Sequence, residues 1–590
     1  MVDFSRRSDR LISLSGPYVL AYLGTLLEVG LLWTALLTLA ARRRGLVRHV
    51  SAASFVVLFG LTSAVQGAFF QLFDIYATLD AHLHCRSLPW AIVATLPLGR
   101  THLVARLLGS FALGVALVIA ARRFVRPRRS RRIAAAVVFP LASLGLIAMP
   151  VSYRGLQAAA PEALYFHGLA GLVKERVGLT HLAQVRMQRR TPQSVPALVP
   201  KSPRNVLFIL HESLRQEVTC PKDQAGPCKR PARFSTAEVP DRMVFGAMRA
   251  NSSSTLISLS VLLSGVSPAS DDATLYGAPL LFEYAQAAGY DSAYWTSQNV
   301  IYGNMRMFLQ DAPASHLAFA TNLAPEADFD VGAKDALLAD RAIAEWGELR
   351  EPFVAVTHFS NTHVPYLVSP NDTPYAPAAD TDDPARVAEL RNYYKNAVFH
   401  SDRHVARLIR HVRASASGAR TVIVFTSDHG EIFGEHHLPH GHTSSSFDNE
   451  ILVPAWIDAP PQTLREEERA AIVGAAERAT WHVDLHATLL DLMGLWDEPG
   501  LASFRSRMAG QPLTREPRTS GPVAISNCNG LWHSALCNWG MMQGSRKVQL
   551  VAGLPGALCT DVAIDPLERS FLREEECADL VRVAERTFLR

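Results

Sequence analysis

Four long apolar segments in the first 152 residues limit most strongly how this chain can fold. They cover roughly residues 17–40, 50–71, 103–120 and 133–151, and a helix of this length and composition can cross about 30 Å of hydrocarbon. No small-residue cleavage site follows the first segment, so we do not interpret it as a removable signal peptide. The sequence therefore predicts a transmembrane module at residues 1–152 with about four spans.

Basic residues are concentrated in two short loops between these segments. Four arginines lie between residues 42 and 48 and seven between 122 and 132, more positive charge than the net +4 of the whole chain. Such loops stay on the cytoplasmic side, which places the chain from Ser152 onward outside the cytoplasm. A fifth span through Pro89–Leu98 is an alternative that leaves this conclusion unchanged. The rest of the chain is net negative, which argues against nucleic-acid binding.

The chain changes character after the apolar segments. Apolar and basic residues mix between Tyr153 and Arg190, which suits a helix lying along the membrane interface. Four prolines between residues 192 and 203 then predict a stiff linker. We therefore divide the chain into a membrane module at 1–152, an interfacial helix and linker at 153–203, and an extracytoplasmic domain at 204–590.

Cysteine usage agrees with an oxidising location for this domain. Six of the seven cysteines fall after residue 203, and Cys85 is left over. Other connectivities are open, but pairing by sequence neighbourhood joins Cys220 with Cys228, Cys528 with Cys537, and Cys559 with Cys577.

From residue 205 onward, short β-rich runs alternate with helical stretches. This alternation predicts an α/β fold with a largely parallel sheet, in which the last strand suits an edge because it contains Pro454. The expected strands are Asn205–Leu210, Val244–Arg249, Ser292–Thr296, Phe353–His358, Thr421–Ser427 and Leu452–Ile457. The expected helices are Ala278–Ala288, Ala333–Trp346, Ala385–Val412 and His482–Met493.

Metal-ligating side chains follow several of these strands. Glu212 follows the first, His358 ends another, and Asp428 and His429 follow a later one. Ligands of parallel sheets gather at the carboxyl ends of the strands. Two carboxylates, one imidazole and the hydroxyl of Thr255 form a suitable four-ligand zinc set. A metal ion there favours loss of the hydroxyl proton, which predicts a nucleophile for phosphoryl or sulfuryl transfer.

Four motifs, in this order, resemble a known family. They are NVLFILHESLR at 205–215, STLISLSVLLSG at 254–265, HFSNTH at 358–363 and TSDHGEIFGEHHLPHGH at 426–442. The resemblance is to the membrane-anchored phosphoethanolamine and phosphoglycerol transferases of the alkaline phosphatase/sulfatase superfamily, and it covers roughly residues 205–495. It implies a helical transmembrane module followed by a sulfatase-like α/β domain with a largely parallel central sheet.

The resemblance also implies roles for single residues. The family's metal ligands fall on Glu212, Asp428 and His429, and its phosphorylated threonine, also a ligand, falls on Thr255. Its substrate-site histidines fall on His358 and His363. A further site histidine best matches His440, with His442 as a competitor because the spacing after His429 is one residue shorter here. The implied metal is zinc, with manganese also suited to an oxygen-rich site.

The implied reaction transfers phosphoethanolamine or phosphoglycerol from a membrane phospholipid to a lipid or glycan acceptor of the cell envelope. The implied location is the bacterial inner membrane, with the catalytic domain on the periplasmic side. A smaller C-terminal subregion, about 500–590, resembles that of sulfatases and favours a sulfatase-like hydrolase as the alternative. The sulfatase formylglycine motif fits poorly, because Cys228–Arg233 has one residue too many. A third hypothesis is a non-catalytic scaffold that kept the fold. Loss of a metal ligand would be its signature, but Glu212, Thr255, Asp428 and His429 are all present.

Overall fold

The computed structural model describes most of the chain. The described residues are 3, 16–41, 45–73, 76, 99–125, 128–148, 159–176, 190–222, 228–300, 305–325, 327–328, 331–381, 383–438, 440–517, 521–527, 538–551 and 556–588. The chain forms two compact units, the first within residues 1–182 and the second comprising nearly all of residues 183–590. Pro89–Leu98, Cys85 and the Cys528–Cys537 pair lie outside the described residues, so these predictions stay untested.

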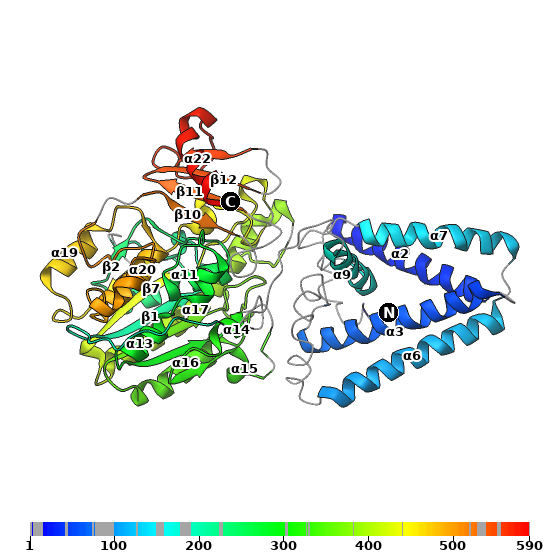
Figure 1. Cartoon of the computed structure of the whole chain (residues 1–590), viewed down its shortest axis with the longest axis horizontal. Coiled ribbons are helices and arrows are strands. Elements are labelled where there is room, and N and C mark those ends of the chain that lie inside the picture. The colour runs from blue at the N-terminus through cyan, green and yellow to red at the C-terminus, as the bar shows by residue number, and fades with distance from the viewer. Residues whose placement is uncertain are drawn as a thin grey trace. The chain divides into compact units, whose positions relative to one another are not determined.

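The first unit is helical (Figure 1). Helix α3 packs against α6, and α2 packs against α7 and α3, with Trp33 edge-on to Phe55 at 5.4 Å between ring centroids. The helices are α2 (Gly16–Ala40), α3 (Leu46–Phe73), α6 (Gly99–Phe124), α7 (Arg129–Ala148) and α9 (Pro161–Arg176). Helix α9 packs against α2, α3 and α7, and its predicted place at the membrane interface stays a prediction.

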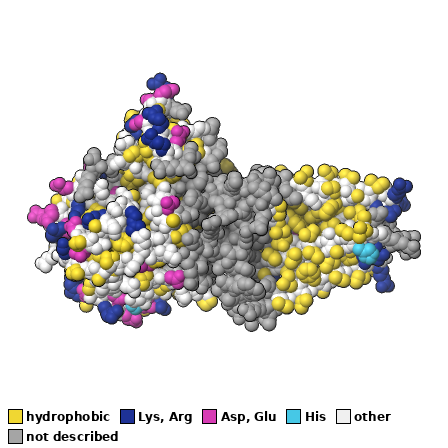
Figure 2. Space-filling view, in the orientation of Figure 1, with side chains coloured by type: hydrophobic (Ala, Val, Ile, Leu, Met, Phe, Trp, Pro, Cys, Tyr) yellow, Lys and Arg dark blue, Asp and Glu magenta, His cyan; other side chains and the backbone are white. Residues whose placement is uncertain are grey.

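Three of these helices are long and apolar enough to cross a membrane, namely at Val19–Ala40, Leu46–Ala68 and Val104–Phe124. The fourth predicted segment is also helical, as α7, but its first turn holds Arg129, Arg131 and Arg132. The count of four spans therefore stays a prediction. Hydrophobic side chains cover much of the outer surface of this unit, and Lys and Arg gather at one end of it (Figure 2), as expected of helices in lipid.

The second unit is built on a seven-stranded sheet with the order β2-β8-β7-β1-β6-β4-β5. Strands β7, β1, β6, β4 and β5 are parallel, whereas β8 runs antiparallel to β7 and to β2. The strands are β1 (Asn205–His211), β2 (Met243–Phe245), β4 (Asp291–Thr296), β5 (His316–Ala318), β6 (Phe353–Phe359), β7 (Thr421–Ser427) and β8 (Ala455–Asp458). The predicted fold class is confirmed.

Alternate residues of β1 enter two hydrophobic clusters because side chains along a strand point to opposite faces. Val206, Phe208 and Leu210 join one cluster, and Leu207 and Ile209 join the other. Helices cover both faces (Figure 1), so the central strands are buried throughout. Helices of the first cluster include α11 (Thr255–Ser264), α13 (Leu281–Ala287) and α20 (His482–Leu492). Helices of the second include α16 (Asp335–Glu345) and α17 (Val387–Ala414).

Two expectations about the strands were wrong. The predicted strand Val244–Arg249 is divided between β2 and the short β3 (Met248–Arg249), which pairs with β9 (Thr480–Trp481) in a separate sheet. Strand β8 is not an edge strand, because it lies between β2 and β7. Pro454 precedes the first paired residue of β8, Ala455, so its missing N–H interrupts no ladder bond.

A second sheet forms the C-terminal subregion. It contains β10 (Val523–Ser526), β11 (Trp539–Gln543), β12 (Arg546–Leu550) and β13 (Leu558–Asp561) in antiparallel order, and α22 (Ala578–Phe588) packs on it. Buried Lys547 joins this sheet to the start of helix α18 (Asp448–Ile451), because its Nζ lies 2.9 Å from Asp448 Oδ1. The same Nζ lies 2.8 Å from Glu568 Oε1, within the C-terminal subregion. The sheet is thus anchored to the core of the second unit by buried charges.

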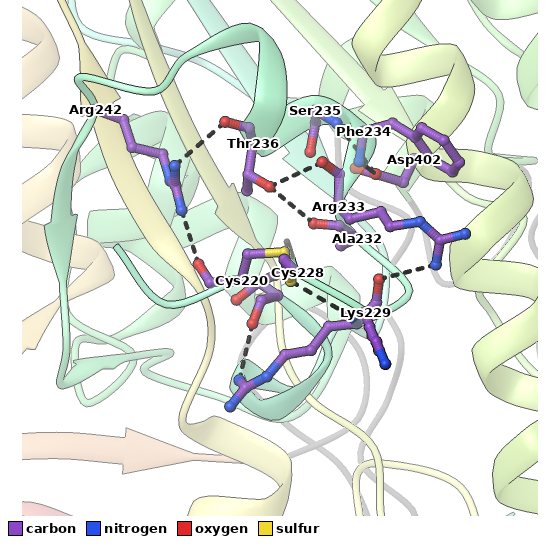
Figure 3. The surroundings of a disulfide bond; sticks show 12 residues. Cys220, Cys228, Lys229, Ala232, Arg233, Phe234, Ser235, Thr236, Arg242 and Asp402 are labelled. Atoms are coloured by element: carbon purple, nitrogen blue, oxygen red, sulfur yellow. Dashed lines mark hydrogen bonds between the residues drawn. A yellow bond between two sulfur atoms is a disulfide. The ribbon is translucent and has the colours of Figure 1, made fainter. Parts of the chain in front are cut away.

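Two of the predicted disulfides, Cys220–Cys228 and Cys559–Cys577, are confirmed. The first closes a short loop after β1 (Figure 3). The remaining helices are α10 (Phe234–Glu238), α12 (Asp272–Gly277), α14 (Met305–Leu309), α15 (Ala320–Leu323), α18 (Asp448–Ile451), α19 (Glu466–Gly474) and α21 (Ala502–Arg505).

Candidate active site

Four of the predicted site residues meet at the carboxyl edge of three neighbouring strands. Glu212 directly follows β1, His358 is the last residue but one of β6, and Asp428 and His429 directly follow β7. Strand β1 lies between β6 and β7, so the three strand ends are adjacent. All four side chains are buried.

Thr255 enters this cluster from a helix start. It is the first residue of α11, after the N-cap Ser254. Its Oγ1 lies 3.2 Å from Glu212 Oε1 and 3.0 Å from His429 Nε2. The helix N-terminus also presents backbone N–H groups and the positive end of the helix dipole, both of which favour a bound anion. A hydroxyl in this position can act as a nucleophile beside a metal ion.

The cluster has the geometry of a metal site. One ligand atom each from Glu212, His358 and Asp428 lies within 4.8 Å of the other two. His429 Nε2 lies 3.2 Å from Glu212 Oε1 and 3.4 Å from Asp428 Oδ2. Asp428 Oδ2 and His358 Nε2 are buried and make no hydrogen bond. Buried polar atoms that make no hydrogen bond are costly, so these two ligand atoms fit a bound cation.

The electrostatics favour a cation as well. Burial and the nearby Glu212 raise the pKa of Asp428 to about 6. Burial alone lowers the pKa of His429, but the charges of Asp428 and Glu212 raise it to about 10. Burial also opposes ionisation of Glu212, yet the imidazoles of His358 and His429 hold its pKa well below the usual value. Two buried carboxylates therefore demand positive charge, which protons or a metal ion can supply.

Backbone contacts orient two of the ligands. Asp428 Oδ1 accepts hydrogen bonds from the N–H groups of Ser213, at 3.0 Å, and His429, at 2.7 Å, which leaves Oδ2 toward the cluster. His429 Nδ1 lies 2.8 Å from the carbonyl oxygen of Gly430. A carbonyl only accepts, so Nδ1 carries a proton and Nε2 is presented to Thr255.

The remaining predicted histidines fall into two groups. His363 Nε2 lies 3.2 Å from His442 Nε2, and the His442 ring stacks on His429 at 4.5 Å between centroids. His440 instead contacts Tyr366, with Nε2 2.5 Å from the hydroxyl, and lies 3.8 Å from Glu431 Oε1. The geometry thus brings His442, the competitor in the sequence analysis, against the other site histidines.

Asn527, at the end of β10, contacts the loop before the threonine. Its Oδ1 accepts hydrogen bonds from Ser253 N, at 2.7 Å, and Ser252 Oγ, at 3.1 Å. Its Nδ2 donates to the carbonyl oxygen of Ser445, in the segment that follows His442. Sequence reasoning did not identify Asn527 as a site residue, and no local motif marks a contact across more than 270 positions.

The chain is similar to several known proteins. Residues 204–495 match the Sulfatase family model, whereas no curated protein matches the chain. One similar solved structure is the lipooligosaccharide phosphoethanolamine transferase A (EptA) of Neisseria meningitidis, with 17% identity, TM-score 0.47, and coverage of 79% of this chain and 88% of that one. Another is the phosphonate monoester hydrolase of Agrobacterium radiobacter, with 18% identity, TM-score 0.47, and coverage of 65% and 94%. The zinc complex of the periplasmic domain of Escherichia coli EptC has 19% identity, TM-score 0.44, and coverage of 55% and 92%.

The second unit therefore contains a sulfatase-like domain at residues 204–495. The chain combines this sulfatase-like domain with three helices that are long and apolar enough to cross a membrane.

The contacts of Asn527 predict a positioning role. We expect Asn527→Ala to lower kcat for phosphate- or sulfate-ester turnover by about tenfold to a hundredfold, because a small displacement of a reacting group is costly. KM and metal content should change little. Gln543→Ala, at an exposed end of the same sheet, is the matched control. An unchanged kcat in Asn527→Ala would contradict the role.

Proposed function

We propose that this protein transfers a phosphoethanolamine or phosphoglycerol group from a membrane phospholipid to a lipid or glycan of the cell envelope. The observation that carries the proposal is Thr255 Oγ1, which lies at a helix N-terminus within 3.2 Å of both Glu212 and His429. A hydroxyl nucleophile beside metal ligands suits double displacement at phosphorus.

The residues present fit a metal ion. Glu212, Thr255, Asp428 and His429 would hold it, with His358 adjoining, and the mixed oxygen and nitrogen donors suit zinc or manganese. When bound, the ion supplies positive charge that lowers the pKa of the Thr255 hydroxyl and offsets charge on the phosphoryl oxygens.

In the first half-reaction, Thr255 Oγ attacks the phosphorus and the bond to the diacylglycerol oxygen breaks. His363 and His442 adjoin the cluster and are suited to bind the phosphoryl oxygens or to protonate the departing oxygen. His440 instead contacts the hydroxyl of Tyr366. In the second half-reaction, an acceptor hydroxyl or phosphate takes the group from phospho-Thr255 and restores the free hydroxyl.

Membrane helices suit this reaction because the donor and the released diacylglycerol both stay in the bilayer. The arginine loops favour an inner-membrane protein whose catalytic domain faces the periplasm. The two disulfides support the same side, since such bonds persist in oxidising compartments.

A sulfatase-like hydrolase is the second candidate, favoured by the C-terminal sheet that contacts the loop before Thr255. Sulfatase chemistry needs a cysteine or serine that is oxidised to formylglycine. Cys228, in the nearest motif, is bonded to Cys220 instead, and a threonine occupies the nucleophile position. Both facts favour the transferase.

Mass spectrometry after incubation with phosphatidylethanolamine tests the proposal. The full-length, detergent-solubilised protein should show a phosphoethanolamine adduct on the Thr255 peptide, and diacylglycerol should be released. A Thr255→Ala protein should show neither. Parallel incubation with phosphatidylglycerol distinguishes the two head groups. Turnover of an aryl sulfate or phosphodiester without any adduct would instead assign the hydrolase.

A further inference from the structure

A separate cavity of about 690 Å³ lies beside strands β2 and β8. Its walls come from five parts of the chain, namely residues 215–222 after β1, residues 230–246 up to and around β2, residues 448–456 leading into β8, residues 473–477 around the end of α19, and residues 566–567. None of Glu212, Thr255, Asp428 and His429 lines it. The volume is in the range of small-molecule binding sites, roughly 300–1,000 Å³, and we name it the β2–β8 cavity.

A buried cation forms part of its wall. Arg242 is 5% exposed, and its guanidinium bonds backbone carbonyls, including that of Cys220 at 2.8 Å and that of Thr236 at 3.3 Å (Figure 3). Its Nε has no hydrogen-bond partner. Among the described residues no carboxylate forms an ion pair with it. Burial lowers its pKa, and the charge of Asp458 offsets this effect only in part. The guanidinium therefore adds positive charge to this wall of the cavity.

Two further cations line the same cavity. Exposed Lys222 and partly exposed Arg230 also belong to the wall, and in the described part of the chain neither pairs with a carboxylate.

The acidic groups of the wall are mostly neutralised. Glu217 pairs with Arg215 at 3.1 Å. Asp448 is tied to Arg249 and Lys547 at 2.5 and 2.9 Å. Glu477 is the one remaining carboxylate of the wall. The cations described above therefore outnumber it.

The rest of the wall is largely apolar. Met243 and Phe245 are buried within it. Val473 and Leu567 also line it but are 52% and 51% exposed, so they border its opening. Exposed large apolar side chains beside a cavity indicate an apolar occupant.

We propose that the β2–β8 cavity binds an anionic amphiphile, a phosphate or carboxylate group on a short apolar body. The anion pairs with the wall cations Lys222 and Arg230, the charge of Arg242 adds to their attraction, and the apolar body lies along Met243 and Val473. This binding goes beyond the proposed transfer reaction and does not require Thr255.

Titration calorimetry with hexyl phosphate tests the proposal on the full-length chain held in amphipol. The chain carries Thr255→Ala, and the buffer contains a chelator, so the metal site contributes little. Hexanol and inorganic phosphate are the two comparison probes, because each has only one of the two parts. We expect saturable binding of hexyl phosphate, and binding of hexanol and phosphate at least about tenfold weaker.

Two surface substitutions avoid the folding role of Arg242. Lys222→Glu reverses a wall charge, and Val473→Trp fills the opening; each should weaken hexyl phosphate binding by about tenfold or more. The controls are Lys229→Glu, an exposed lysine of the same disulfide loop outside the wall, and Val199→Trp, a valine 72% exposed elsewhere. Equal affinity in Lys222→Glu and Lys229→Glu, or in Val473→Trp and Val199→Trp, would overturn the proposal. Hexanol or phosphate binding as tightly as hexyl phosphate would overturn it too.

Discussion

Thr255→Ala is expected to lower turnover by about 10³-fold or more, the scale seen when a covalent nucleophile is removed. Thr255 Oγ1 is the side-chain hydroxyl within 3.2 Å of Glu212 and His429, and alanine offers no oxygen to attack phosphorus. Thr255→Ser keeps the oxygen but loses the methyl group that limits its rotamers, so we expect a fall of about tenfold. The measurement is the initial rate of diacylglycerol release from phosphatidylethanolamine.

Ser260→Ala is the matched control for Thr255→Ala. Ser260 lies in the same helix α11, is equally buried, and donates its hydroxyl to the carbonyl oxygen of Leu256 within the helix. Its loss should leave turnover within about twofold of the original rate. If Thr255→Ala and Ser260→Ala turn over at similar rates, Thr255 is not the nucleophile.

The cluster of side chains at the sheet edge could be predicted because the positions of these residues depend on strand topology alone. Glu212, His358, Asp428 and His429 each end or follow a buried strand, and parallel strands deliver such residues to one edge. Short apolar runs identified these strands, and the helices between them had clear periodicity. The Cys220–Cys228 and Cys559–Cys577 disulfides could be predicted because the two cysteines of each pair are close in the sequence.

Other features depend on contacts that no local pattern encodes. The choice between His440 and His442 is set by the path of the loop after Ile432, which pairs back with Gly441. Asn527, directly after strand β10, contacts Ser253 in the loop before helix α11, although the two residues are far apart in the sequence. The place of β8 inside the sheet depends on the very short β2, whose three residues give too little signal for strand pairing. The β2–β8 cavity could not be predicted for the same reason, because its wall comes from five separate parts of the chain.

Asp428→Asn is expected to remove most bound metal and to lower turnover by about 10²–10³-fold, since metal charge stabilisation is worth several kcal/mol. The substitution changes only one of the two carboxylate oxygens. Asp428 Oδ1 accepts two backbone hydrogen bonds, which an asparagine oxygen can keep, whereas the unpartnered Oδ2 becomes a neutral amide nitrogen that cannot bind a cation. Elemental analysis of the purified protein measures the loss.

Asp402→Asn separates a metal effect from the general effect of neutralising a buried carboxyl. Asp402 is also buried, burial likewise raises its pKa to about 6, and its Oδ2 accepts from the N–H groups of Phe234 and Ser235 at 2.6 and 3.1 Å. It lies outside the ligand cluster, so Asp402→Asn should keep both metal and turnover. Equal metal content in Asp428→Asn and Asp402→Asn would rule out Asp428 as a ligand. Loss of turnover with metal retained would instead limit Asp428 to holding the Ser213 and His429 backbone in place.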